Sequence, residues 1–286
     1  MKNLKNNNGK IGIFDSGLGG LTILKEIIKL MPNREYLYLG DNLRAPYGEK
    51  TQAEIFKYTL AGVEWLFGRG AEIIILACNT ASANALQKIQ QEILPFKYKN
   101  KRVLGIIIPT IENIDNFSKF GHIGVLATKA TVASGVFEKE AKKYCPKIQI
   151  ISQSGERLAE MIELNKNEKD LKAEIKKVVE QLIAQDEFMD TVILGCTHYA
   201  LIENQIKKAL PKNISIIGQG EIVAVKLFDY LNRHSEICQK LSTKCSTYFY
   251  TTSSDGKAKE LMTQFYGAKI SIETVVCEAT QKTMYN

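Results

Sequence analysis

The chain has 286 residues, which is long for one compact domain and sufficient for two. Its 45% hydrophobic and 24% charged residues are the proportions of an ordinary globular protein. No apolar run approaches the roughly 18 residues that a membrane-spanning helix requires. No apolar segment follows the basic stretch at residues 1–10, which argues against a secretory signal, and we expect a short disordered tail there. These features predict a cytoplasmic protein that needs no membrane.

The net charge of +7 does not by itself indicate a nucleic-acid-binding protein. Lysines are interspersed with glutamates along stretches such as 171–180, which is typical of a solvated helix surface. We therefore expect no required nucleic-acid partner. The six cysteines form no CxxC pair and no regular spacing, so we expect reduced thiols that are mostly buried.

Predicted strands and helices alternate along almost the whole chain. Strands are expected at 10–15, 35–40, 72–77, 102–108 (stopped by Pro109), 121–128, 147–152, 190–195, 214–218 and 246–252. Helices are expected at 19–31, 50–70, 82–94, 131–144, 156–186, 199–210, from 221 onward and at 257–267. This alternation predicts an α/β protein with mostly parallel sheets and helices on both faces.

Residues that can carry chemistry stand directly after the predicted strands. In parallel sheets, ligands bind beyond the carboxyl ends of the strands, so these positions are the candidates for a site. They are Asp15-Ser16, Asp41-Asn42, Cys78-Asn79-Thr80, Thr128 and Cys196-Thr197-His198.

A weak internal repeat supports two copies of one α/β unit. The segment 11–16 (IGIFDS) is similar to 123–128 (IGVLAT), and 73–86 (IIILACNTASANAL) is echoed by 192–201 (VILGCTHYAL). The two pairs are separated by nearly the same number of residues. Two such copies would face each other and hold a ligand in the cleft between their strand ends.

The first turn, Gly17-Leu18-Gly19-Gly20, resembles a dinucleotide-binding fingerprint without matching it. Thr22 stands where the third glycine would be, and Asp15 would repel a pyrophosphate at the mouth of the turn. A tight strand-to-helix turn explains the glycines. The same turn would offer backbone N–H groups and Ser16 to a small carboxylate.

Cys78 and Cys196 are candidate catalytic groups because each follows a strand and precedes a helical segment, whose N-terminus stabilises a thiolate. His198 is the histidine that lies beside a cysteine at a strand end. A zinc site is disfavoured because Cys196-x-His198 lacks a second pair with ligand spacing, so no metal is expected. A Cys-His-Asp hydrolase is possible in composition but leaves one cysteine without a role. The other cysteines and histidines are assigned to structure.

Two thiols on opposite sides of a cleft suit the inversion of a stereocentre by proton transfer. One group removes a proton from one face of a carbon while the other delivers a proton to the opposite face. A thiol, with a pKa near 8.5, is readily tuned so that both protonation states exist at working pH.

Five segments in order give the chain a family resemblance: GIFDSGLGGLTIL, GDNLRAPYGEKT, ACNTASANAL, ATKATVASG and LGCTHY. Together they resemble the glutamate racemases, cofactor-independent enzymes of the aspartate/glutamate racemase superfamily. The match runs from residue 11 over nearly the whole chain, and the segment YFYTTSSDGKAKELMTQFYG also resembles that family's C-terminal part.

The resemblance implies two pseudo-symmetric, flavodoxin-like domains with the active site in the cleft between them. The expected boundaries are 9–107 plus 220–286 for one domain and 108–219 for the other. It also implies interconversion of L- and D-glutamate without a cofactor, for peptidoglycan synthesis, and it leaves a homodimer open. Two other readings also stay open: an aspartate or other amino-acid racemase, and a non-catalytic ligand-binding protein on the same scaffold.

The resemblance further implies roles for individual residues. Cys78 and Cys196 match the two acid/base cysteines, Asp15 the acid that supports the first thiol, and His198 the group that supports the second. The positions that match substrate-binding residues are Asp15, Ser16, Tyr47, Gly48, Asn79, Thr80, Thr128, Thr131, Thr197 and His198.

The chain departs from the family pattern at four places. The family usually has Pro at Ala200, Gly at Thr110, a Glu that polarises the active site near Gln153, and an acidic residue at Gly218-Gln219. If Gln153 replaces that Glu, one charge is missing beside the second thiol, which would alter rate and pH optimum.

Overall fold

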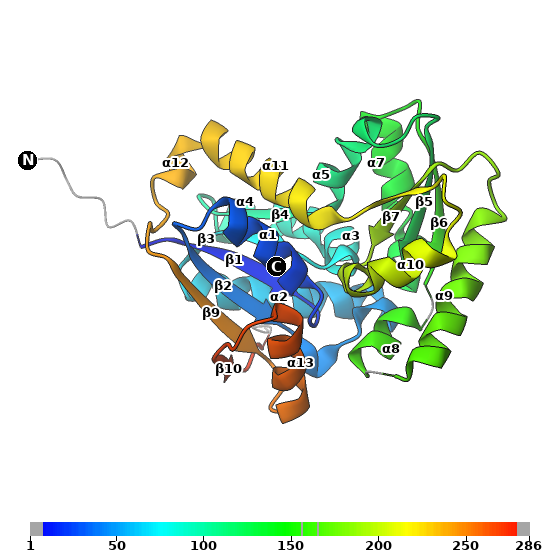
Figure 1. Cartoon of the computed structure of the whole chain (residues 1–286). Coiled ribbons are helices and arrows are strands. Elements are labelled where there is room, and N and C mark those ends of the chain that lie inside the picture. The colour runs from blue at the N-terminus through cyan, green and yellow to red at the C-terminus, as the bar shows by residue number, and fades with distance from the viewer. Residues whose placement is uncertain (1–7, 156, 165, 279–286) are drawn as a thin grey trace, which may run out of the picture.

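The structure, a computed structural model, describes residues 8–155, 157–164 and 166–278 and consists of two α/β halves (Figure 1). Residues 1–7 of the tail predicted at 1–10 lie outside this description, whereas Lys10 already belongs to the first strand. Among the described residues, no helix has the length and apolar character needed to cross a membrane.

The strands of the described chain form two entirely parallel sheets. The first sheet has the order β10-β9-β2-β1-β3-β4 and the second β6-β5-β7-β8. The first consists of β1 (Lys10–Asp15), β2 (Glu35–Gly40), β3 (Ala71–Leu76), β4 (Arg102–Gly105), β9 (Ser246–Thr251) and β10 (Ile272–Thr274). The second consists of β5 (His122–Ala127), β6 (Gln149–Ser154), β7 (Thr191–Gly195) and β8 (Ser215–Ile217).

The helices that connect the strands cover both faces of each sheet (Figure 1). The α-helices are α1 (Gly20–Leu30), α2 (Gln52–Gly68), α3 (Asn79–Lys88), α4 (Leu94–Lys97), α5 (Ile107–Ile111), α6 (Lys129–Ser134), α7 (Val136–Tyr144), α8 (Leu158–Glu163), α9 (Glu168–Ile183), α10 (Glu203–Ala209), α11 (Gln219–Arg233), α12 (Ser235–Cys238) and α13 (Gly256–Tyr266). Shorter turns are η1 (Asn42–Arg44), η2 (Tyr47–Glu49), η4 (Ile114–Asn116), η5 (Thr197–Ile202) and the π-helical η3 (Ile89–Ile93).

The same strand order appears in both sheets, as the internal repeat predicted. In the first sheet β1 lies between β2 and β3, and in the second β5 lies between β6 and β7. The repeat segments therefore occupy equivalent strands, β1 with β5 and β3 with β7. The predicted α/β class and its two-domain arrangement are confirmed. The predicted domain boundaries stay a prediction.

Each sheet is buried on both faces, which explains its continuous runs of apolar residues. Along β1, Ile11 and Ile13 pack into one apolar cluster, and Phe14 packs into another on the opposite face. Along β7, Val192 packs into one apolar cluster and Ile193 packs into another on the opposite face. Adjacent residues of a strand point to opposite faces, so each half has two apolar cores.

Two chain crossings join the halves, and both are packed into the cores. The first runs from β4 through α5 to β5, and the second from β8 into α11. In α11, Ile222 packs in the core of the second sheet while Val223 and Leu227 pack in the core of the first. The helix thus begins beside the second half and runs over the first half toward α12 (Figure 1).

The prediction of a strand over 102–108 is wrong in its second part. β4 ends at Gly105, and Ile107, Ile108 and Pro109 form the first turn of α5. Proline is tolerated there because the first N–H groups of a helix have no acceptor within the helix. The predicted helix over 131–144 is likewise broken at Gly135, which has a φ of +59°. The predicted helix over 156–186 is divided into α8 and α9.

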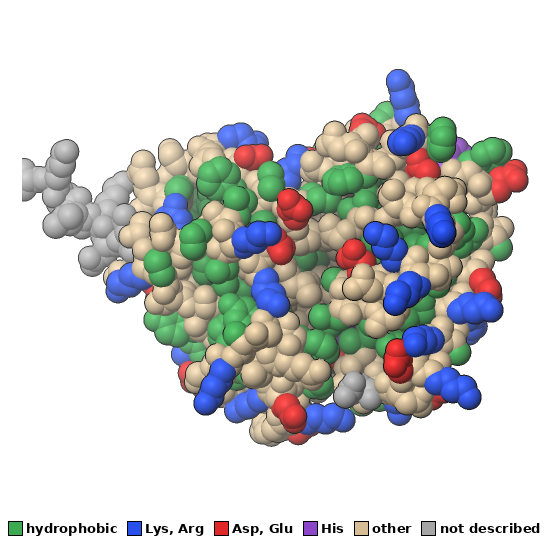
Figure 2. Space-filling view, viewed as in Figure 1, with side chains coloured by type: hydrophobic (Ala, Val, Ile, Leu, Met, Phe, Trp, Pro, Cys, Tyr) green, Lys and Arg blue, Asp and Glu red, His purple; other side chains and the backbone are tan. Residues whose placement is uncertain are grey.

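Lys and Arg side chains are scattered over both halves on the face shown in Figure 2. Many are paired with acidic neighbours, such as Lys172 with Glu168 and Lys226 with Glu112. On that face the excess positive charge forms no single basic patch of the kind that binds nucleic acid.

Candidate active site

The two candidate cysteines lie at equivalent places in the two halves. Cys78 follows β3 and is the N-cap of α3, while Cys196 follows β7 and precedes η5. Both are buried, with 5% and 6% of their surface exposed. The charge of Cys196 contributes to the raised pKa of Cys78, so the two sulfurs lie within electrostatic range of each other. The fold therefore brings the two thiols together from strand ends in separate sheets.

Cys78 lies in surroundings that favour its protonated form. Burial is the largest cause and the nearby charge of Asp15 adds to it, raising the pKa of the thiol to about 11. Two hydrogen bonds act in the opposite direction, from the Ser16 hydroxyl at 3.2 Å and from the backbone N–H of Ala81 at 3.4 Å. At neutral pH this side of the site holds a thiol.

Asp15 ends β1 and lies between the two halves. It is fully buried, its Oδ2 accepts the backbone N–H of Gly17 at 2.9 Å, and its Oδ1 accepts the Thr197 hydroxyl at 3.5 Å. Burial raises the pKa of its carboxyl, while the charge of His198 opposes this rise. Asp15 is thus hydrogen-bonded both to the turn after β1 and to Thr197, the residue after Cys196.

Cys196 lies beside a histidine and a glutamate. The Nδ1 atom of His198 is 3.7 Å from the Cys196 sulfur, and its Nε2 is 2.8 Å from Oε1 of Glu163. Burial lowers the pKa of His198, but its hydrogen bonds to Cys196 and Glu163 and the charges of both raise it well above its ordinary value. His198 therefore presents a proton, and with it a positive charge, to the sulfur.

Glu163 is the site residue that the sequence interpretation missed. It ends α8 and lies 33 positions before Cys196, so no spacing pattern links the two. The expectation that Gln153 occupies the place of a polarising glutamate is wrong. Gln153 lies on β6 and bonds to Gln181 and Gln185, away from His198. The carboxylate on the Cys196 side is therefore that of Glu163, which contacts His198.

Three threonine hydroxyls from both halves form a closed triangle. Thr80 of α3 lies 2.8 Å from Thr128 and 3.2 Å from Thr131, which are themselves 3.0 Å apart. Gly48 of η2 packs against Thr128, since a Cβ atom at Gly48 would lie 2.8 Å from the Cβ of that threonine. All four are predicted to bind substrate, and the structure places the three threonines in mutual contact, with Gly48 against one of them.

Tyr47 and Asn79 are brought to the same region, but their side chains have protein partners. The hydroxyl of Tyr47 donates to Oδ2 of Asp41 at 2.5 Å, and the nearby charge of Cys78 contributes to the raised pKa of Tyr47. The amide of Asn79 is paired with Gln219. Any role of Asn79 toward a ligand therefore falls to its backbone N–H at the start of α3.

Two of the positions that depart from the family pattern contact each other. The Gln219 amide donates to the Thr110 hydroxyl at 3.0 Å. Gly218 is the N-cap residue of α11, and Ala200 lies within η5.

Cys145, His122 and His234 have partners outside the group formed by Cys78, Cys196 and His198. Cys145 donates to a backbone carbonyl of α5, and His122 and His234 pair with Asp186 and Glu236. In the part of the chain that the structure describes, no group of three or more His, Cys, Asp or Glu side chains is arranged to hold a metal ion.

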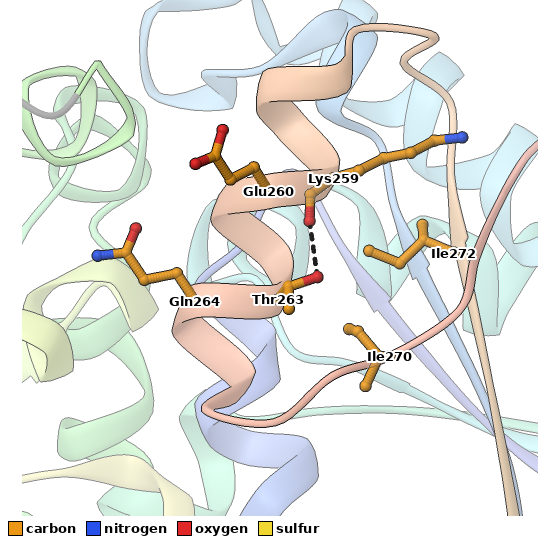
Figure 3. Close-up of a pocket in the computed structure, with 6 residues that line it drawn as sticks. All are labelled: Lys259, Glu260, Thr263, Gln264, Ile270 and Ile272. Atoms are coloured by element: carbon orange, nitrogen blue, oxygen red, sulfur yellow. Dashed lines mark hydrogen bonds between the residues drawn. The ribbon is translucent and has the colours of Figure 1, made fainter.

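Two surface hollows are separate from these residues. Figure 3 shows one of about 500 Å³ beside α13, lined by Lys259, Glu260, Thr263, Gln264, Ile270 and Ile272. A larger groove of about 880 Å³ runs between α3, α7 and α11. Neither lining includes Cys78 or Cys196, which are both buried.

The fold is an α/β arrangement of two similar parallel sheets, with a buried cysteine after an equivalent strand of each. The profile of the Asp/Glu/Hydantoin racemase family matches residues 18–227, and the chain belongs to this family. It is a racemase, an enzyme of the isomerase class.

Similar proteins span nearly the whole chain. A glutamate racemase of Paracoccus denitrificans is 38% identical over 92% of this chain and 99% of its own length. The crystal structure of the glutamate racemase isoform RacE1 from Bacillus anthracis has a TM-score of 0.85 at 32% identity, covering 96% of this chain and all of that one. The glutamate racemase of Francisella tularensis in complex with D-glutamate has a TM-score of 0.82 at 30% identity, covering 94% and 98%.

Proposed function

We propose that this racemase interconverts L- and D-glutamate without a cofactor, by proton transfer between two cysteines at Cα. The observation that carries the proposal is the pair of buried thiols, each at the end of an equivalent strand and each with its own proton partner. The glutamate racemases of similar sequence and fold, one of them crystallised with D-glutamate, support glutamate as the substrate.

The protonation states of the two sides suit a two-base reaction. Cys78 is a thiol at neutral pH because burial raises its pKa to about 11. The Cys196 sulfur lies 3.7 Å from Nδ1 of His198, whose own pKa is raised well above its ordinary value, so that a proton is held beside this sulfur. Cys196 therefore takes the Cα proton of one enantiomer, and Cys78 delivers its proton to the opposite face.

This reaction leaves the two thiols in exchanged states. Cys196 is then a thiol and Cys78 a thiolate, which is the form that acts on the other enantiomer. A second turnover in the same direction requires the protons to return through solvent. During transfer the negative charge at Cα spreads into the α-carboxylate, and hydrogen-bond donors around that carboxylate lower the barrier.

Donors for two carboxylates are available between the halves. The backbone N–H groups at the start of α3 and the hydroxyls of Ser16, Thr80, Thr128 and Thr197 belong to residues that are at least nine-tenths buried. A buried dianion requires such partners, because an unpaired charge in this environment is strongly unfavourable. Binding of glutamate would replace the mutual bonds of the threonine hydroxyls with bonds to a carboxylate.

The wider role follows from the substrate. D-glutamate made by this enzyme would supply peptidoglycan synthesis, a cytoplasmic step, and no nucleic acid or membrane takes part in the chemistry. A homodimer is the assembly to look for in solution, for example by light scattering.

The test uses the purified chain with each enantiomer of glutamate and no added cofactor. Optical rotation should fall to zero from either side, and in heavy water deuterium should appear at Cα of the product. Exchange with aspartate but not glutamate would change the assigned substrate. Exchange with neither would contradict the proposal.

A further inference from the structure

The side chain of Gln219 is buried, fully hydrogen-bonded and not used by the reaction proposed above. It is the first residue of α11 and only 4% exposed. Its Oε1 accepts the Asn79 amide N–H at 2.6 Å, while its Nε2 donates to Oδ1 of Asn79 at 3.1 Å and to the Thr110 hydroxyl at 3.0 Å. Thr110 in turn donates to the carbonyl of Ile106 at 2.8 Å. We call these three side chains, Asn79, Thr110 and Gln219, the amide cluster.

The pairing between Asn79 and Gln219 requires a carboxamide at both positions. Each partner offers one N–H donor and one C=O acceptor to the other, so both polar ends are satisfied at once. An apolar residue at 219 would leave a buried donor and acceptor of Asn79 without partners, which is unfavourable. An ionised glutamate has no N–H, so one of its two carboxylate oxygens would face Oδ1 of Asn79 as acceptor against acceptor.

Three chain segments meet in the amide cluster. Thr110 lies on α5, the first crossing between the halves, and Gln219 begins α11, the second crossing. Asn79 directly follows Cys78 and opens α3, whose backbone N–H at Ala81 donates to the Cys78 sulfur. The cluster therefore connects both crossings to the strand end that carries one thiol.

We propose that Gln219 is a positioning residue, which holds Asn79 and thereby fixes Cys78 relative to the half that carries Cys196. The proposal rests on the proposed two-cysteine racemisation. Gln219 has no contact with either sulfur among its hydrogen bonds, so it acts through Asn79. Its counterpart role on the Cys196 side belongs to Glu163, which holds His198.

The test replaces Gln219 by leucine, which is similar in size but has no amide. We expect kcat to fall by about tenfold or more, with a smaller change in KM, because proton transfer by Cys78 is misaligned. A lower kcat could come either from a misplaced Cys78 or from a smaller amount of folded enzyme. The deuterium isotope effect, measured with substrates deuterated at Cα, distinguishes these two causes. The isotope effect on kcat/KM should rise for the enantiomer that loses its proton to Cys78 and fall for the other.

The Cys78→Ser variant identifies the enantiomer concerned. Its remaining thiol exchanges the Cα proton of one enantiomer only, so the other enantiomer is the one that Cys78 deprotonates. The matched control is Leu231→Ala, a change of a buried residue on the same helix that lies outside the amide cluster. It should lower the Tm of the protein while leaving both isotope effects at the wild-type values.

A second variant, Gln219→Glu, restores the pairing only when its carboxyl is protonated, since that form has one donor and one acceptor. Its kcat relative to the wild type should therefore increase as pH is lowered, and that of Gln219→Leu should not. Unchanged kcat in Gln219→Leu, or a lower kcat with unchanged isotope effects, would overturn the role of Gln219. Absence of racemisation in the wild type would instead contradict the proposed function.

Discussion

The two cysteine sides of the site are built on equivalent strands yet differ in how they hold a proton. On one side Cys78 has only a hydroxyl and a backbone N–H beside its sulfur, and its pKa is raised to about 11. On the other side Cys196 is paired with a histidine whose own pKa is raised by Glu163. The same strand order thus supports two different proton environments.

The difference shows why a repeat alone does not make two equal bases. The residue after each cysteine begins a helical turn in both halves, and in the second half this turn supplies His198, the partner of Cys196. The partner of Cys78 is instead Ser16, directly after β1, and Glu163 at the end of α8 acts on Cys196 only through His198. Equivalent strand ends therefore carry thiols with different neighbours, a hydroxyl beside Cys78 and an imidazole beside Cys196.

The largest effect is expected from removing either thiol. Cys78→Ser and Cys196→Ser should each lower the rate of racemisation by roughly 10²- to 10⁴-fold, the range typical of a lost acid/base group. Each variant should keep Cα exchange with a different enantiomer, because the remaining thiol removes a proton from one face only. Polarimetry and proton NMR in heavy water measure the two quantities. Near-normal racemisation in either variant would contradict the two-base mechanism.

A smaller effect is expected from Glu163→Gln. Losing the carboxylate lowers the pKa of His198, so the histidine loses its proton at a lower pH. The alkaline limb of the pH–rate profile should therefore move to lower pH, and the rate at neutral pH should fall on the order of tenfold per unit of pKa change. The profile of kcat against pH measures this shift.

The matched control for Glu163→Gln is Gln153→Ala. Gln153 contacts Gln181 and Gln185 on the side of α9, so its loss should leave the pH–rate profile unchanged. A displaced profile in Gln153→Ala with a normal one in Glu163→Gln would show that the polarising group had been assigned to the wrong residue.

The smallest effect concerns stability on the Cys78 side. Burial raises the pKa of Asp15 above 3.8, so between that value and its folded pKa the unfolded chain is ionised while the folded chain keeps the proton. Stability from this group therefore decreases as pH rises through this window. Asp15→Asn should raise Tm by about 1–3 °C at pH 7 and change it little below pH 4. An equal change at both pH values, measured by calorimetry, would contradict this account.

Much of the fold could be predicted from the sequence because apolar runs and turn residues are local signals. The strands that carry Asp15, Cys78 and Cys196 were predicted within a residue of their observed ends. The segment 106–109 was misread because three isoleucines favour a strand, whereas packing of Ile107 into the second core makes the chain turn into α5.

The site was predictable where its residues follow strands, and not where they depend on packing. Cys78, Cys196 and His198 stand at strand ends and are visible in a linear pattern. Glu163 and Gln219 reach their partners through the placement of α8 and α11 on the sheets, and no spacing encodes this. The family resemblance predicts the acidic group at Gln153, ten positions before Glu163, which is the carboxylate that contacts His198.

The strand order of the first sheet has a consequence for synthesis of the chain on the ribosome. β9 pairs along the whole of β2 but is translated only after all four strands of the second sheet. Until then the edge of β2 has unpaired backbone groups, which can join strands of other chains. The second sheet is contiguous in sequence and can close first, so the nascent chain would complete the Cys196 side before it covers this open edge.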